Sequence, residues 1–242
     1  RVAGRNAEAR TLLEGLLEEM GRRRSKERAT IHHQLALVAR ADKDLASAIE
    51  HLDQAAAMDV GGQEVLVDLA ETAELAGAFD RAERAYQSLL VLARRSDAAT
   101  APLSAGETLL RLSYVATKRG DEAAAAERMD SAMAAALQDT AEANRLQKAF
   151  VSRGELDRAM SLLERRASAA ATGTEEARVM CDRALLFQEL GRADEAMAAI
   201  ALAIDKAPDL ADAHDLGRKV ANAMKDPQRY LRLVEEGSHH SV

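Results

Sequence analysis

A pattern of two amphipathic helices joined by a short turn recurs along this chain, and it limits the possible folds more than any other feature. The clearest copy covers residues 177–210. On both sides of Gly191, apolar residues recur at spacings of three and four, as expected for one face of a helix. Glycine readily adopts the left-handed conformation that ends a helix, and Pro208 cannot continue the second helix. This copy is therefore predicted to be a helical hairpin.

Small residues within this copy are spaced so that the two helices can pack closely. Ala184 and Ala196 allow the backbones to approach, while Phe187 and Ile200 fill the volume beside them. The copy matches the preferred positions 4, 7, 8, 11, 15, 20, 24, 27 and 32 of a 34-residue unit, with Met180, Arg183, Ala184, Phe187, Gly191, Ala196, Ile200, Ala203 and Pro208. In these residues the chain resembles the tetratricopeptide repeat family.

The same pattern continues in register and predicts a single solenoid over residues 1–242. We expect a half repeat at 4–21, full repeats near 29–62, 63–96, 106–139, 140–173 and 177–210, and a weak C-terminal repeat at 211–236. The extra residues at 96–102 are interpreted as a longer loop, because the pattern resumes after them. The resemblance implies an all-α, right-handed α–α superhelix of about thirteen helices, with turns near Lys43, Gly77, Gly120, Gly154 and Gly191.

Composition agrees with a helical chain and limits its environment. Of the 242 residues, 48% are hydrophobic, 2% are aromatic and three are proline. No apolar run of about 18 residues is present, so we expect no membrane insertion. The single cysteine, Cys181, excludes an internal disulfide, and the compartment stays open with a cytoplasmic location favoured.

The ends and the residue usage of the chain suggest where it comes from. The sequence starts without Met, close to half a unit, so we expect a piece of a longer protein. Arginine outnumbers lysine and alanine is abundant, which hints at a bacterial source.

No motif for catalysis, metal binding or nucleotide binding is present. The phosphate-binding, dinucleotide-binding and zinc-protease motifs are all absent, so we expect no enzyme activity and no cofactor. His32 occupies a core position and should pack there, and the adjacent His33 points about 100° away, so the pair should not bind one metal. The net charge of −7 disfavours nucleic acid, and the basic run at 22–26 lacks interleaved aromatic residues.

The resemblance implies that the first helices of the units line a concave groove for a peptide or helix of a partner protein. In the family, positions 2, 5, 9 and 12 of the unit face this groove. Carried over to this chain, they give the candidate groove residues His33, Leu37, Arg40, Val67, Glu71, Glu74, Leu110, Tyr114, Asn144, Lys148, Cys181, Leu185 and Gln188.

Read at unit positions 2, 5, 6, 9 and 12, the charges change sign along the predicted groove. Glu64, Asp68, Glu71, Glu74 and Glu107 make one part acidic, and Arg111, Arg145 and Lys148 make the next part basic. Such a surface would orient a partner segment with a basic end, an apolar middle and an acidic end. The alternative is that these charges pair with one another across adjacent helices.

The favoured function is therefore a protein–protein interaction scaffold without catalysis of its own. The alternative is a regulatory or substrate-recruiting domain of a larger enzyme or signalling protein whose catalytic part lies outside this chain. Partner identity, pathway and oligomeric state stay open.

Overall fold

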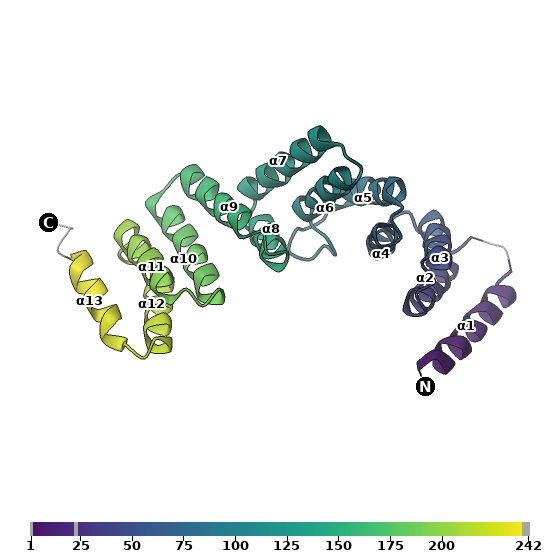
Figure 1. The fold of residues 1–242 in the computed structure, drawn as a ribbon, viewed down its shortest axis with the longest axis horizontal. Helices are drawn as coiled ribbons and strands as arrows, with labels where there is room; N and C mark the ends of the chain where they lie inside the picture. The colour runs from purple at the N-terminus through teal and green to yellow at the C-terminus, as the bar shows by residue number, and fades with distance from the viewer. Residues whose placement is uncertain (1, 22–23, 239–242) are drawn as a thin grey trace. The chain divides into compact units, whose positions relative to one another are not determined.

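The computed structural model describes residues 2–21 and 24–238, and all regular secondary structure in these residues is helical (Figure 1). The helices of these residues are α1 (Val2–Glu19), α2 (Lys26–Ala41), α3 (Leu45–Met58), α4 (Gln63–Leu75), α5 (Phe79–Ala93), α6 (Ala105–Lys118), α7 (Glu122–Gln138), α8 (Thr140–Ser152), α9 (Leu156–Ala169), α10 (Gly173–Glu189), α11 (Ala193–Lys206), α12 (Ala211–Ala223) and α13 (Pro227–Ser238). The predicted all-α class and the predicted number of helices are confirmed.

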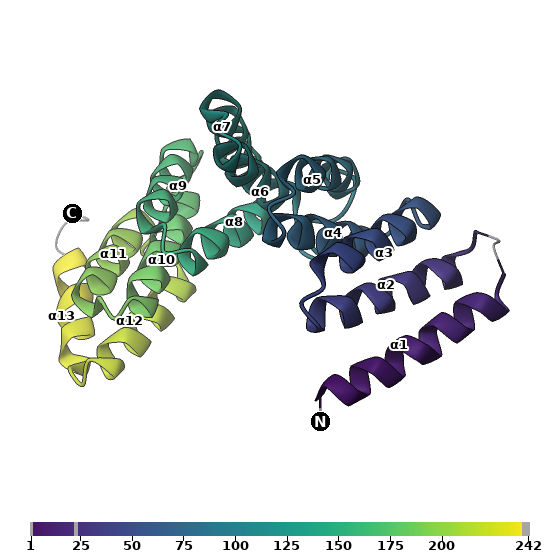
Figure 2. The ribbon, with the colours of Figure 1, turned by 45° about the vertical axis from the view of Figure 1, so that its right-hand side comes forward.

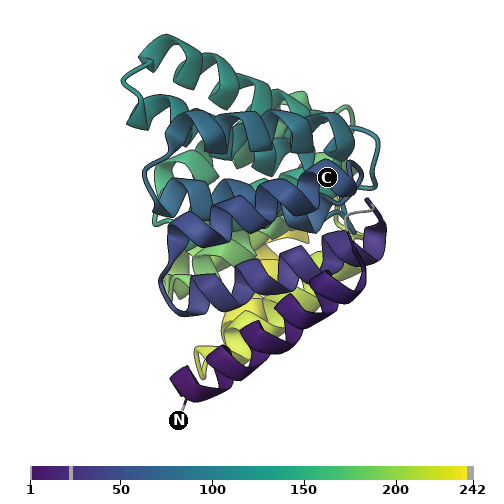
Figure 3. The same ribbon diagram turned by 90° about the vertical axis from the view of Figure 1, so that its right-hand side faces the viewer.

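The chain divides into two compact units, which we call the N-terminal unit (1–146) and the C-terminal unit (147–242). In the N-terminal unit α1 packs on α2, α2 on α3, and so on through α7, and Figures 2 and 3 show these helices stacked in sequence order. In the C-terminal unit α9 to α13 pack in the same sequential way. Tandem hairpins are thus confirmed within each unit, while one continuous solenoid over both units stays a prediction.

The turns inside the hairpins lie where the sequence predicts them. Lys43, Gly77, Gly120, Gly154 and Gly191 all have positive φ, between 64° and 79°. At each turn, the residue that follows donates its backbone N–H to a carbonyl five residues earlier, as Asp44 does to Ala39 (2.9 Å). This is the bond of a Schellman motif, which satisfies the carbonyl groups at the end of the first helix. A sixth turn of the same kind lies at Lys225, φ 59°.

Lys43 is the position where this turn chemistry is least favourable. The left-handed conformation costs an L-residue about 1–2 kcal/mol. Glycine avoids this cost, but it also has a larger entropy in the unfolded state, so replacement by glycine recovers only a part of it. We expect Lys43→Gly to raise the free energy of unfolding by about 0.5–1 kcal/mol, measured by urea denaturation. Lys118→Gly is the matched control, because Lys118 lies in the last turn of α6 and glycine there should cost about 1 kcal/mol. Equal losses in both variants would contradict the role of the turn.

Each unit has its own hydrophobic core built around small residues. In the N-terminal unit Ala36, Ala70 and Ala82 are completely buried, and in the C-terminal unit Ala184 and Ala196 are. These alanines occupy the positions at which the sequence predicts close helix contacts. Larger side chains such as those of Leu52, Tyr86 and Ile200 fill the remaining volume, also without exposure.

The weak C-terminal repeat forms a complete hairpin with its own packing. A Cβ atom on Gly217 would lie 2.8 Å from the ring of Tyr230, so the glycine makes room for that side chain. His214 forms hydrogen bonds through Nδ1 with the Tyr230 hydroxyl (2.8 Å) and through Nε2 with the carbonyl of Pro208 (2.5 Å). Gly217 and His214 therefore both accommodate the side chain of Tyr230.

Candidate protein-binding surface

The predicted groove residues belong to the first helices of the hairpins, but they divide between the two units. The N-terminal unit carries His33, Leu37 and Arg40 on α2, Val67, Glu71 and Glu74 on α4, Leu110 and Tyr114 on α6, and Asn144 on α8. The C-terminal unit carries Lys148, Cys181, Leu185 and Gln188. The N-terminal unit therefore contains most of the candidate surface.

Charged side chains on α2, α4 and α6 pair with one another. Arg40 contacts Asp68 (2.9 Å) and Glu71 (3.8 Å), and Arg111 contacts Glu71 (3.5 Å) and Glu74 (3.9 Å). The Nε2 atom of His33 also lies 2.6 Å from Asp68 Oδ2. We call this set the charge ladder: His33, Arg40, Asp68, Glu71, Glu74 and Arg111. The side chains of the charge ladder are partly exposed. For these residues the structure shows the alternative interpretation, in which the charges pair across adjacent helices.

Arg145 also serves an internal role instead of lining a basic stretch of groove. Its guanidinium donates hydrogen bonds to the carbonyls of Ala98 (2.8 Å), Ala101 (2.6 Å) and Pro102 (2.9 Å). It also forms an ion pair with Glu107 at 2.6 Å. Arg145 therefore holds the loop between α5 and α6. Its guanidinium is already bound within the chain, so it does not add a basic group for a partner as the sequence predicted.

Two candidate groove residues are buried, so their assignment to an open surface was wrong. Leu110 is 2% exposed, because α6 has buried residues on most of its sides. Cys181 is 8% exposed and lies in the core of the C-terminal unit beside Ala177 and Ala184. Burial raises the pKa of the Cys181 thiol to about 11, with smaller contributions from nearby carboxylates, which keeps the thiol protonated at neutral pH.

The remaining apolar candidates lie at or near the surface. Leu37 is 38% exposed beside the charge ladder, and Val67 and Tyr114 are partly buried. Leu185 and Gln188 are exposed on α10, and Asn144 and Lys148 are exposed on α8. The charge ladder with Leu37, Val67 and Tyr114 forms the continuous part of the candidate surface, and we call it the first-helix face.

Glu142 is a residue with a structural role that sequence reasoning missed. Its carboxylate accepts hydrogen bonds from the Ser104 hydroxyl (2.5 Å) and from the backbone N–H groups of Ala105 and Gly106 (3.0 Å each). Glu142 is 7% exposed. From α8, it thus provides the acceptor for backbone N–H groups at the start of α6. A local signal exists only for the capping box of Ser104 and Glu107, which the structure contains.

His32 packs in the core as predicted. It is buried, and its Nδ1 atom lies 3.2 Å from Nδ1 of His51 on α3. Burial lowers the pKa of both imidazoles; for His32, the neighbouring His51 and Arg28 lower it further. Within residues 2–21 and 24–238, no group of three or more His, Cys, Asp or Glu side chains could hold a metal ion.

This histidine pair, of which His32 is buried and His51 partly buried, should make stability depend on pH. Because the folded-state pKa values lie below the unfolded value of about 6.5, the unfolded state binds more protons, and stability should be lost as the pH falls below about 6.5. Denaturation of wild type between about pH 7.5 and pH 5 should show this loss. The double variant His32→Leu/His51→Leu should show a shallower loss. An equally steep loss in both proteins would rule out the pair as its source.

No described helix of the chain is long and apolar enough to cross a membrane. The two arginines at 22 and 23, within the basic run, lie outside the described residues.

No family model matches the sequence, and no curated protein matches it either. Among solved structures, a tetratricopeptide repeat protein from Parabacteroides merdae is 15% identical, with a TM-score of 0.45 over 99% of this chain and 88% of that chain. YrrB, a TPR protein with an unusual peptide-binding site, is 17% identical, with a TM-score of 0.38 over 83% and 95%. A thermophilic TPR protein of Thermus thermophilus is 20% identical, with a TM-score of 0.35 over 81% and 98%. Over most of its length, the chain is thus similar to tetratricopeptide repeat proteins.

Proposed function

We propose that this chain is a protein–protein interaction scaffold that binds an extended or helical segment of a partner on the first-helix face. The observation that carries the proposal is the pairing of charges from three successive first helices beside the exposed Leu37. A surface whose side chains are already held in place loses little conformational entropy on binding. The scaffold has no catalysis of its own, and its partner is neither a nucleic acid nor a membrane. A bacterial, cytoplasmic setting belongs to the same proposal.

The charges of the first-helix face favour a basic partner segment. In the charge ladder, two guanidinium groups face three carboxylates, and the nearby Glu64 on α4 is exposed. A Lys or Arg of the partner would complement this excess, and an apolar side chain would cover Leu37. Apolar contacts supply most of the affinity at such surfaces, whereas partly exposed charges mainly set orientation and association rate.

The test is capture of a partner by the purified chain, followed by affinity measurements with a peptide of the captured segment. Leu37→Asp should weaken binding at least about tenfold, equivalent to about 1.4 kcal/mol, at every salt concentration. Glu64→Lys should weaken it mainly at low salt, because salt screens exposed charges. Glu64 is preferred to Glu71 here, since Glu71 lies between Arg40 and Arg111 and its replacement by Lys would break the charge ladder.

Val91→Asp is the matched control for this test. Val91 is an exposed apolar residue on α5, a second helix, so its replacement changes charge and hydrophobicity away from the first-helix face. Wild-type affinity in Val91→Asp, together with loss in Leu37→Asp, supports the proposal. If Leu37→Asp and Glu64→Lys both bind with wild-type affinity, the partner does not use this face.

A further inference from the structure

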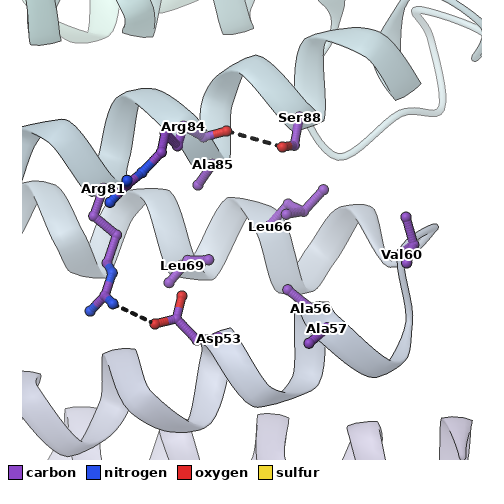
Figure 4. A pocket seen from close by; sticks show the side chains of 10 residues that line it. All are labelled: Asp53, Ala56, Ala57, Val60, Leu66, Leu69, Arg81, Arg84, Ala85 and Ser88. Atoms are coloured by element: carbon purple, nitrogen blue, oxygen red, sulfur yellow. Dashed lines mark hydrogen bonds and ion pairs between the residues drawn. The ribbon is translucent and has the colours of Figure 1, made fainter.

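A pocket with a volume of about 510 Å³ lies on another side of the N-terminal unit. Its walls are residues of two second helices, α3 and α5, with Val60 of the turn after α3, and Leu66 and Leu69 of α4 lie between them (Figure 4). On α4, Leu66 lies two residues before Asp68 of the charge ladder, and Leu69 lies two residues before Glu71. Two residues apart means about 160° apart around the helix axis. The pocket is therefore separate from the first-helix face.

The two ends of the pocket differ in chemistry. Asp53, Arg81 and Arg84 lie at one end, and Val60 lies at the other (Figure 4). Val60 is 78% exposed, so an apolar side chain stands open to solvent at this end. Ala56, Ala57 and Leu66 continue the apolar surface into the pocket.

The polar end carries an excess positive charge. Arg81 forms an ion pair with Asp53 at 2.9 Å, which joins α5 to α3. Within the part of the chain that the structure describes, the guanidinium of Arg84 has no ion-pair partner within 4.0 Å. Burial raises the pKa of Asp53, Arg81 and Arg84 oppose this rise, and the carboxylate of Glu50 adds to it, so both guanidinium groups act on the same carboxylate. Among the residues that line the pocket, two guanidinium groups therefore accompany one carboxylate, in a chain whose net charge is −7.

The size of the pocket suits a short extended segment. Asp53 lies on α3, about 7.5 Å along the helix axis from the last residue of that helix, Met58, and Val60 lies in the turn just beyond it. An extended chain rises about 3.3 Å per residue, so about three residues span this length, and side chains two residues apart point to the same side.

We propose that this pocket is a second docking site, which takes a partner segment with a carboxylate side chain and an aliphatic side chain two residues apart. The carboxylate pairs with Arg84 at the polar end. The aliphatic side chain packs against Val60, Ala57 and Leu66 at the other end. Charge complementarity selects the occupant, because the excess cation requires an anion and the open apolar end requires an apolar side chain. The site goes beyond the proposed function, since it does not use the first-helix face.

The experiment uses two labelled peptides with the whole chain: an acetylated, amidated Gly-Glu-Ser-Leu-Gly and the same peptide with Lys in place of Glu. Fluorescence anisotropy should show saturable binding of the Glu peptide to wild type, with weaker binding of the Lys peptide. Arg84→Glu should lower the affinity for the Glu peptide at least tenfold and raise that for the Lys peptide. Val60→Asp should lower the affinity for both peptides.

Two controls separate this site from other surfaces. Arg94→Glu makes the same charge change at the C-terminal end of α5, outside the pocket lining, and should bind the Glu peptide like wild type. Leu37→Asp should also bind it like wild type, so that failure of the first-helix face and failure of the pocket are distinguishable. The proposal is overturned if wild type shows no saturable binding of the Glu peptide, or if Arg84→Glu and Arg94→Glu change its affinity equally.

Discussion

Glu142→Ala is expected to lower the free energy of unfolding of the N-terminal unit by about 2–5 kcal/mol, because each buried hydrogen-bond donor left without its acceptor costs about 1–3 kcal/mol. The carboxylate accepts three hydrogen bonds at the start of α6 while almost completely buried. Its loss leaves the N–H groups of Ala105 and Gly106 without their acceptor. It also removes a negative charge from a helix N-terminus, where the helix dipole favours one.

Two further variants identify the source of this loss in chemical denaturation. Glu142→Gln keeps the side-chain volume and one acceptor oxygen, so its loss should fall between that of Glu142→Ala and zero. Glu127→Ala is the matched control, because Glu127 is exposed in the middle of α7, and it should change stability by no more than about 0.5 kcal/mol. If Glu142→Ala and Glu127→Ala unfold at the same denaturant concentration, the hydrogen bonds to α6 do not stabilise the unit.

Local signals explain why the hairpins could be predicted from the sequence. Each hairpin carries its own turn residue and its own buried small residues, so one pattern is tested many times along the chain. Gly77 and Gly120 end helices through the same backbone bonds that Lys43 uses, although lysine is a poor residue for that conformation. The short apolar spacing around Ala82 and Ala196 likewise predicts burial, and both are completely buried.

Contacts between hairpins were much harder to predict, because they depend on where long side chains end. Arg145 was expected in a groove, yet it reaches the carbonyls of a loop more than 40 residues earlier in the sequence. Leu110 fits a groove position by register, but α6 is enclosed on more sides than the other first helices. Arg166 occupies a position at which the clearest copy has the small Ala203, and it forms an ion pair with Asp182 on α10 at 2.8 Å.

The candidate site shows the same limit. The sequence contains both signs of charge at the first-helix positions, and it supports either an open, polarised groove or internal pairing. Only the distances between α2, α4 and α6 decide for pairing, as Arg40 with Asp68 illustrates. The pocket between α3 and α5 has no signal in the repeat pattern, because Arg84 occupies a position at which the family has no preferred residue and Val60 departs from the proline found at the same position in the clearest copy.

Tyr86→Ala is expected to produce the other large loss of stability, and the loss should be local. Tyr86 is completely buried in the core of the N-terminal unit, and truncation of a buried aromatic side chain costs about 3–5 kcal/mol. In stacked repeats, each hairpin is stabilised mainly by its neighbours. Hydrogen exchange followed by mass spectrometry should therefore show lost protection in α4, α5 and α6, which pack in sequence, with protection in α10 to α12 unchanged.

Ile200→Ala provides the reciprocal experiment in the C-terminal unit. Ile200 occupies the same position of the repeat as Tyr86 and is also completely buried, so its truncation should cost about 2–5 kcal/mol. Protection should then fall in α10, α11 and α12 and persist in α4 to α6. If either variant lowers protection uniformly in both units, the chain unfolds as one cooperative globule and its stability is not the sum of neighbouring hairpins. Opposite, local patterns in the two variants would instead mean that a partner bound to the N-terminal unit stabilises mainly that unit, because coupling between hairpins decays with their separation along the stack.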